Sequence, residues 1–230
     1  MNTHFYRNAL IIGAGQGISA SLTRSLREAG LPVVIASRAA ENLRSLAEET
    51  GAFALSVDAA HASEMERLFG ETDALIGAPE VVIYNASGYV RGSVTTLDPK
   101  SVEQAVAVTA LGAFYAVQQA AKRMVPAGKG AILLTGATAG VKGFALSAPF
   151  AMGKFALRGL AQSAARELMP KGIHVAHFVI DGSVRSAGQS DPSDATLDPD
   201  AVAQTYIDML CQQRSAWSSE IEIRPWVERY

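Results

Sequence analysis

A glycine-rich stretch near the N-terminus constrains this chain more than any other segment. In residues 8–20, a short apolar run meets Gly13, Gly15 and Gly17, and a helical pattern follows. This order predicts a buried strand, a tight turn and a helix, since glycine lets the backbone turn sharply and approach a ligand closely. The start of such a helix is an anion site, so we expect a phosphate there. The glycines alone would also suit a plain turn before a packed helix.

Apolar runs and amphipathic segments alternate along the rest of the chain. The expected strands are residues 9–12, 33–36, 52–57, 81–84, 131–135, 173–180 and 220–223, and the expected helices are residues 17–29, 39–50, 61–76, 99–124, 147–168 and 199–212. Strands separated by helices imply parallel pairing with helices on both faces. The predicted fold class is therefore α/β, a Rossmann-type doubly wound parallel sheet. Because no linker divides the 230 residues, we expect a single domain over residues 1–230.

Charge and composition exclude several classes of protein. The net charge of −2 argues against a nucleic-acid surface. Cys211 is the only cysteine, so no internal disulfide forms, and the cysteine content is compatible with a reducing compartment. No stretch approaches the ~18 apolar residues of a membrane span, and residues 1–7 lack the apolar core of a signal peptide. We therefore expect a cytoplasmic protein that binds neither nucleic acid nor membrane.

Two further segments bear on binding. The polar segment after residue 180 exceeds an ordinary connection, so we predict a substrate lid over residues 183–200. His174 and His177 invite a metal interpretation, but residues three apart on a strand face opposite sides. His4 and His61 add no cluster, and we expect no metal site.

Several motifs in order resemble the short-chain dehydrogenase/reductase family over nearly the whole chain. The family's Gly-x-x-x-Gly-Ile-Gly corresponds to residues 13–19, with Ser19 in place of the last glycine, and its Asn-Ala-Gly corresponds to residues 85–87. Asp58 stands where the family has an aspartate that meets the adenine. Residues 182–186 resemble the end of Pro-Gly-x-Val-x-Thr, with Asp181 in place of the proline. The resemblance implies a dinucleotide site formed by Gly13, Gly15, Gln16, Gly17, Ile18, Ser37, Arg38, Asp58, Asn85, Ala86, Lys154, Gly182, Val184 and Ser186.

The end of the second expected strand indicates which cofactor binds. An acidic residue there would bond both ribose hydroxyls of NAD, whereas an arginine neutralises the additional phosphate of NADP. The residues are Ser37 and Arg38, so we favour NADP(H) over NAD(H). The alternative is that Arg38 only caps a helix or lies on a solvated face.

The catalytic positions depart from the family pattern. The family's tyrosine, four residues before a lysine, corresponds to Phe150 before Lys154. The serine position falls on Ala137 and the asparagine position on Thr109, so only Lys154 is retained. A phenyl ring supplies neither a proton nor a hydrogen bond to a developing alkoxide, and ordinary ketone reduction should be depressed. These residues resemble a divergent subgroup of the family with phenylalanine at the tyrosine position.

Weak substitutes for the missing donor are Thr138, Thr135, Ser147 and Tyr89, each of which also has a structural interpretation. Two functions therefore remain open. The first is an NADP(H)-dependent oxidoreductase with an incomplete catalytic set, acting on a small carbonyl, alcohol or activated alkene. The second is a catalytically silent NADP(H)-binding protein that serves as a sensor or assembly partner. By resemblance, the last strand and its tail join subunits in a homodimer or homotetramer.

Overall fold

A seven-stranded parallel sheet forms the centre of the protein, in the order β3-β2-β1-β4-β5-β6-β7. The computed structural model describes residues 6–186 and 188–228. The strands are β1 (Ala9–Ile12), β2 (Val33–Ser37), β3 (Phe53–Ser56), β4 (Val81–Tyr84), β5 (Gly130–Thr135), β6 (Ile173–Ile180) and β7 (Glu220–Ile223). Every neighbouring pair is parallel. The predicted fold class is confirmed.

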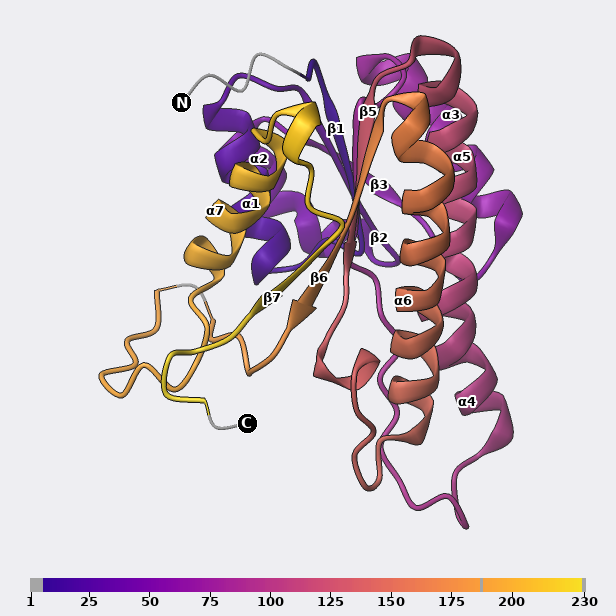
Figure 1. Cartoon of the computed structure of the whole chain (residues 1–230), viewed down its shortest axis with the longest axis vertical. Coiled ribbons are helices and arrows are strands. Elements are labelled where there is room, and N and C mark those ends of the chain that lie inside the picture. The colour runs from indigo at the N-terminus through magenta and orange to yellow at the C-terminus, as the bar shows by residue number, and fades with distance from the viewer. Residues whose placement is uncertain (1–5, 187, 229–230) are drawn as a thin grey trace.

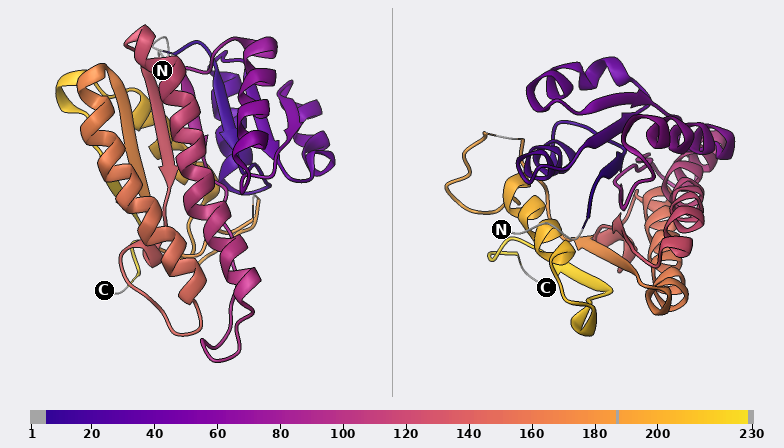
Figure 2. Two further views of the ribbon diagram at one scale, coloured as in Figure 1. Left: turned by 90° about the vertical axis from the view of Figure 1, so that its right-hand side faces the viewer. Right: turned by 90° about the horizontal axis from the view of Figure 1, so that it is seen from above.

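Helices cover both faces of this sheet (Figure 1). One face carries α1 (Ile18–Glu28), α2 (Arg44–Thr50) and α7 (Pro199–Leu210), and the other carries α3 (Ala62–Ile76), α5 (Gly112–Ala127) and α6 (Ala148–Leu168). The short helix α4 (Pro99–Val106) extends past the carboxyl ends of the strands, as the left view of Figure 2 shows. Among the residues that the structure describes, no helix combines the length and apolar character needed to cross a bilayer.

Two apolar cores lie between the sheet and the helices that cover it, one on each face. Successive strand residues point to opposite faces, so Ile11 and Ile35 join the core beneath α1 and α7, while Leu10 and Val34 join the core beneath α3, α5 and α6. All four side chains are fully buried. Burial on both faces explains why central strands such as β1 and β4 read as continuous apolar runs, whereas the edge strand β7 alternates between exposed and half-buried residues.

The long helix predicted over residues 99–124 forms without a gap, but it contains an irregular turn and continues to Ala127. The chain forms α4, then a wider π-type turn over Ala107–Leu111, and then α5, which continues to Ala127. Two side chains take carbonyls that a regular helix would use: the Tyr84 hydroxyl donates to the Val108 carbonyl, and the Thr109 hydroxyl donates to the Ala105 carbonyl at 2.9 Å. Side-chain donors that insert into the helical ladder in this way interrupt it.

The strand order leaves a crevice at the carboxyl ends of β1 and β4. From β1 the chain first builds outward through β2 to β3, and then returns to β4 on the other side of β1. The loops that follow these strands therefore leave in opposite directions. In open α/β sheets, ligands bind at this switch point.

Candidate active site

Three cavities lie along the carboxyl ends of the strands, and Asn85 lines all of them. We call them the Arg38 cavity (about 270 Å³), the glycine cavity (about 430 Å³) and the Lys154 cavity (about 600 Å³), each after a lining residue or motif. Gly13 lines the first two, and Ile18 lines the last two. Shared lining residues make the three cavities one extended groove, which suits a ligand of several linked parts.

The glycine cavity has the form of a phosphate cradle. Gly13 has φ +83° and lies so close to the β4 loop that an added Cβ would stand 2.2 Å from the Ala86 nitrogen. At Gly15 and Gly17, by contrast, an added Cβ would meet nothing within 4 Å, because it would point into the open cavity. The cavity also meets the start of α1, where free N–H groups attract an anion. Gln16, Val184 and Ser186 complete its wall.

Ser19, which replaces the last glycine of the motif, ties this cradle to the β4 loop. Its hydroxyl is buried, accepts a hydrogen bond from Asn85 Nδ2 at 2.8 Å and donates to the Gly13 carbonyl at 3.3 Å. The serine therefore fits because two polar partners surround its hydroxyl. It holds Asn85 at the junction of the three cavities.

Replacing Ser19 with alanine is expected to lower the free energy of unfolding by about 1 kcal/mol, because the Asn85 amide loses its nearest acceptor. In a chain of this size the melting temperature would fall by roughly 2–4 °C. Differential scanning calorimetry measures the change. The double variant S19A/N85A would show no further loss if the two side chains act together, whereas fully additive losses would contradict the coupling.

The Arg38 cavity presents one cationic side chain at the end of β2. Arg38 is exposed, and Ser37 Oγ donates to the Ala39 carbonyl at 3.1 Å. Asp58 itself is absent from the lining, although its neighbours Val57 and Ala59 form part of the wall. One Asp58 carboxylate oxygen accepts the Ala60 N–H at 3.0 Å, which fixes the turn after β3.

Lys154 lies at the floor of the largest cavity. Only 3% of it is exposed, and its Nζ donates to the Thr135 carbonyl at 2.7 Å. Burial lowers the pKa of this ammonium group to about 8, since water no longer solvates the charge. Helix α6 places Phe150 one turn earlier on the same face, with Lys154 Nζ 5.7 Å from the Phe150 ring centroid.

The other catalytic positions of the motif carry no donor into this cavity. Ala137 lines it without a hydroxyl group. Thr109 is fully buried and outside the lining; its hydroxyl accepts the Gly88 N–H at 2.9 Å and packs beneath Gly153. Thr109 therefore joins the β4 loop to the π-type turn and serves the fold.

Of the expected substitutes, Thr135 and Thr138 have their hydroxyl groups engaged. Thr135 Oγ1 lies 2.8 Å from the Tyr206 hydroxyl. Thr138 Oγ1 donates to the carboxylate of Asp181, which occupies the place of the family's proline. Asp181 also lies 3.3 Å from Arg224 and lines the cavity. The sequence showed the aspartate at this position but did not predict its hydrogen bond with the Thr138 hydroxyl.

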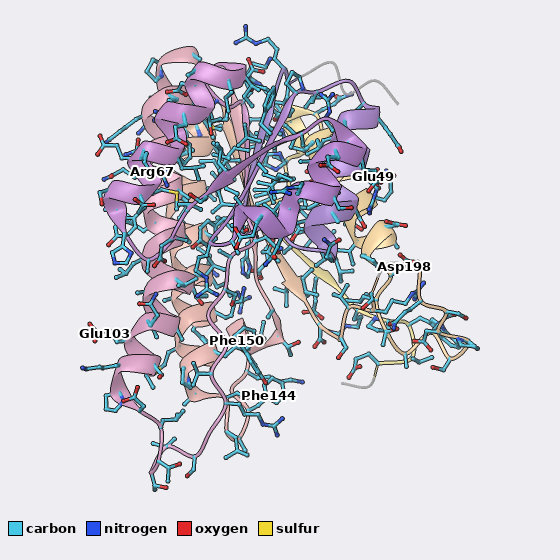
Figure 3. All side chains as sticks on the ribbon, turned by 180° about the vertical axis from the view of Figure 1, so that it is seen from behind. Glu49, Arg67, Glu103, Phe144, Phe150 and Asp198 are labelled. Carbon is cyan, nitrogen blue, oxygen red and sulfur yellow. The ribbon has the colours of Figure 1, made fainter. Side chains whose placement is uncertain are left out.

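Tyr89 and Ser147 line the cavity from loops. The Tyr89 ring packs edge-on against Phe150, with ring centroids 5.2 Å apart. Ser147 is the N-cap residue of α6, which agrees with its structural interpretation, but its side chain makes no capping hydrogen bond. In Figure 3, Phe144 and Phe150 lie below the sheet, and Asp198 lies to the right of them. Both phenylalanines line the Lys154 cavity.

The segment after β6 closes the groove from its other side. Gly182 lines the Lys154 cavity, and Val184 forms a backbone bridge with Leu197. Arg185 lines the glycine cavity and pairs with Asp198, a contact that no sequence motif indicated. The segment thus brings a cation to the phosphate cradle.

The two buried histidines of β6 have separate partners. His174 stacks on Trp217 at 4.7 Å and bonds the Ser218 carbonyl, whereas His177 Nδ1 lies 3.0 Å from Glu220. Burial lowers the pKa of both imidazoles. These contacts give each ring a structural role at the β6–β7 edge.

Comparison with known proteins gives consistent matches over most of the chain. The family model for short chain dehydrogenases matches residues 7–193. A short-chain dehydrogenase from Rhodopseudomonas palustris is 34% identical, with 96% of this chain and 99% of that chain covered and a TM-score of 0.84. A metagenomic short-chain oxidoreductase in complex with NADP is 26% identical, with 96% and 98% covered and a TM-score of 0.82. An uncharacterized oxidoreductase of Staphylococcus aureus strain MW2 is 25% identical, with 94% and 96% covered.

Proposed function

This chain belongs to the short chain dehydrogenase family, and we propose that it is an NADP(H)-dependent oxidoreductase with an incomplete catalytic set. The observation that carries the proposal is the continuous groove, in which a phosphate cradle separates the cationic Arg38 cavity from the cavity floored by Lys154. A dinucleotide has the same order of parts: a base with its ribose, two phosphates and a reactive ring. The NADP complex of the metagenomic relative supports the choice of cofactor.

The residues around the groove fit such a cofactor. The open space above Gly15 and Gly17 would receive the phosphates, together with the N–H groups at the start of α1. Ser37, Arg38 and Ala86 line the cavity proposed for the adenosine end, and Asp58, also a proposed contact, lies between the lining residues Val57 and Ala59. The nicotinamide end would meet the remaining proposed contacts, which are Asn85, Lys154, Gly182, Val184 and Ser186.

Lys154 is proposed as the anchor of the nicotinamide ribose. Its Nζ has one bond to the Thr135 carbonyl, and an ammonium group carries three donors, so two remain for ribose hydroxyls. When bound, the cofactor supplies or accepts the hydride, and the protein supplies orientation. Phe150 in place of a tyrosine supports membership of a divergent subgroup of the family, and this chain is proposed to transfer hydride without a phenol at this position.

Replacing Arg38 with alanine is expected to weaken NADPH binding by roughly 10- to 100-fold and to leave NADH binding nearly unchanged, because only NADPH carries the additional phosphate. Fluorescence titration of the full chain with each nucleotide measures both affinities. Arg44 to alanine, a change in α2 outside the groove lining, is the matched control. Equal weakening of both nucleotides would contradict the assignment of Arg38, and no binding of either would overturn the proposed function.

A second function has specific support. Phe150 and Ala137 provide no proton donor, and the Thr138 hydroxyl is bonded to Asp181. A catalytically silent NADP(H)-binding protein, acting as a sensor or assembly partner, would bind nucleotide tightly without turnover. Single-turnover absorbance of bound NADPH with candidate substrates separates this function from the oxidoreductase.

The segment over residues 183–200 is proposed as the substrate lid, supported by its position across the groove. We also propose a homodimer or homotetramer. Apolar side chains of α5 and α6 are exposed, with Phe114 at 45% and Phe155 at 47%, and Trp226 after β7 is 81% exposed. A cytoplasmic location stays a prediction.

A further inference from the structure

In the Lys154 cavity, Phe150 and Ala137 occupy the positions of the family's tyrosine and serine and donate no hydrogen bond, and a carboxylate stands nearby. A developing alkoxide needs donors, but the Phe150 ring and the Ala137 methyl group have none, and Thr138 directs its hydroxyl hydrogen to Asp181. The Asp181 carboxylate, only 15% exposed, stands in the wall instead. Phe150 and Ala137 therefore give no stabilisation to a substrate oxygen that becomes negative beside them.

We propose that the substrate in this cavity reacts at a cationic carbon–nitrogen double bond, an iminium ion, or at the corresponding amine in the reverse direction. The proposal rests on the proposed oxidoreductase function and names its substrate class. It follows from the absence of a donor in the positions where the family has its acid, together with a carboxylate in the wall.

The reaction of an iminium ion needs no proton donor. Hydride from NADPH adds to the carbon, the electron pair of the C=N bond moves to nitrogen, and the products are a neutral amine and NADP⁺. The substrate is reduced, the nucleotide is oxidised, and no proton enters or leaves. Before hydride transfer the nitrogen carries its full positive charge, so a nearby carboxylate favours binding of the iminium ion over a neutral ketone or the neutral amine.

Asp181 keeps negative charge available to the cavity. Its partner Arg224, at 3.3 Å, also pairs with Glu222, so one guanidinium group is shared between two carboxylates. Glu228 adds a second acidic side chain to the lining. Among the described residues that line the cavity, Lys154 is the only lysine or arginine, and burial lowers its pKa to about 8, which reduces its opposing charge in mildly alkaline solution.

Aromatic rings form another wall. Tyr89, Phe144 and Phe150 line the cavity, and ring faces attract cations. Two of these rings already have an ammonium group nearby: Lys154 Nζ lies 5.7 Å from the Phe150 centroid, and Lys142 Nζ lies 5.6 Å from the Phe144 centroid. Tyr89 is 61% exposed, so part of its ring surface is accessible to a cation that enters the cavity.

The first test measures binding of two bicyclic probes of similar size, the permanent cation N-methyl-3,4-dihydroisoquinolinium and the neutral ketone 1-tetralone. Isothermal titration calorimetry is performed on the full chain, both free and saturated with NADP⁺. We expect the cation to bind at least about tenfold more tightly than the ketone. Asp181→Asn should lose about tenfold in cation affinity and little in ketone affinity, since asparagine keeps the size and an acceptor for Thr138.

Glu103→Gln is the control, because it removes an exposed carboxylate of α4 that lies outside the cavity lining. It should leave the preference for the cation intact. Equal binding of the probes, binding of neither, or an unchanged preference in Asp181→Asn would overturn the proposal.

The second test follows oxidation of NADPH with each probe. Consumption with the iminium ion but not with the ketone supports the proposal. If the ketone alone is reduced, and Tyr89→Phe abolishes that reaction, then the iminium proposal is wrong and Tyr89 is the acid, while the oxidoreductase function stands. If NADPH does not bind at all, the proposed function fails, and binding of the probes to the free protein still decides whether the cavity selects cations.

Discussion

Replacing Lys154 with methionine is expected to stabilise the protein at pH 7 and to weaken NADPH binding by roughly 10- to 100-fold, the loss that follows removal of a charged hydrogen-bonding group. The stabilisation arises because burial lowers the pKa of Lys154 from 10.5 to about 8, a difference of about 3 kcal/mol. Loss of the bond to the Thr135 carbonyl opposes this gain by roughly 1–2 kcal/mol. A net gain of about 1–2 kcal/mol therefore remains at pH 7.

The stability difference between the methionine variant and the wild type should depend on pH, because Lys154 titrates at a different pH in the folded and unfolded states. Below pH 8 the ammonium group is charged in both states, and the folded state bears the whole cost of burying it. Between pH 8 and 10.5 the folded state releases this proton while the unfolded state keeps it, so the wild-type protein recovers stability as the pH rises. The advantage of the methionine variant should therefore shrink across this window and reverse near its upper end.

Urea unfolding of the wild type and the variant at pH 6 to 10 measures the difference. Comparing the two proteins cancels the titration of Tyr84 and Tyr206, whose pKa values burial also raises. Lys122→Met, at an exposed position of α5, is the control and should change the free energy of unfolding by less than about 0.5 kcal/mol. A Lys154 variant that is less stable than the wild type throughout this range would contradict a cost of burial.

The strands of the sheet could be predicted because each of them corresponds to a local run of apolar residues. β4 and β6 begin and end where their apolar runs do, since both faces of each strand are covered. The π-type turn between α4 and α5 could not be predicted in this way. It depends on the Tyr84 hydroxyl, which reaches the Val108 carbonyl from a strand 24 residues earlier in the chain.

The candidate site likewise contains some positions that could be predicted from the sequence and some contacts that could not. The positions of Gly13, Asn85 and Lys154 around one groove follow from motif spacing once the fold is assumed. The bond from Thr138 to Asp181 and the presence of Arg185 at the phosphate cradle depend on how the chain after β6 folds back. Residues far apart in sequence make these contacts, so no local sequence pattern predicts them.

Replacing Gly15 with aspartate is expected to remove nucleotide binding while leaving the fold intact. An added side chain at Gly15 meets nothing within 4 Å, so the protein itself has room for it. The carboxylate would stand in the glycine cavity, where the proposed phosphates bind. Two unit charges about 4 Å apart at an effective dielectric constant of about 20 repel by roughly 4 kcal/mol, which corresponds to about a 1,000-fold loss of affinity.

Gly15→Asn is the matched control, because it has almost the same size without the charge. Titration with NADPH should show a moderate loss for asparagine and a much larger loss for aspartate, and the gap between them should narrow in high salt as the repulsion is screened. Circular dichroism and the melting temperature of both variants should stay close to wild type. Equal affinities for the two variants would mean that no phosphate lies near Gly15, and the nucleotide would then have to enter the groove in another orientation.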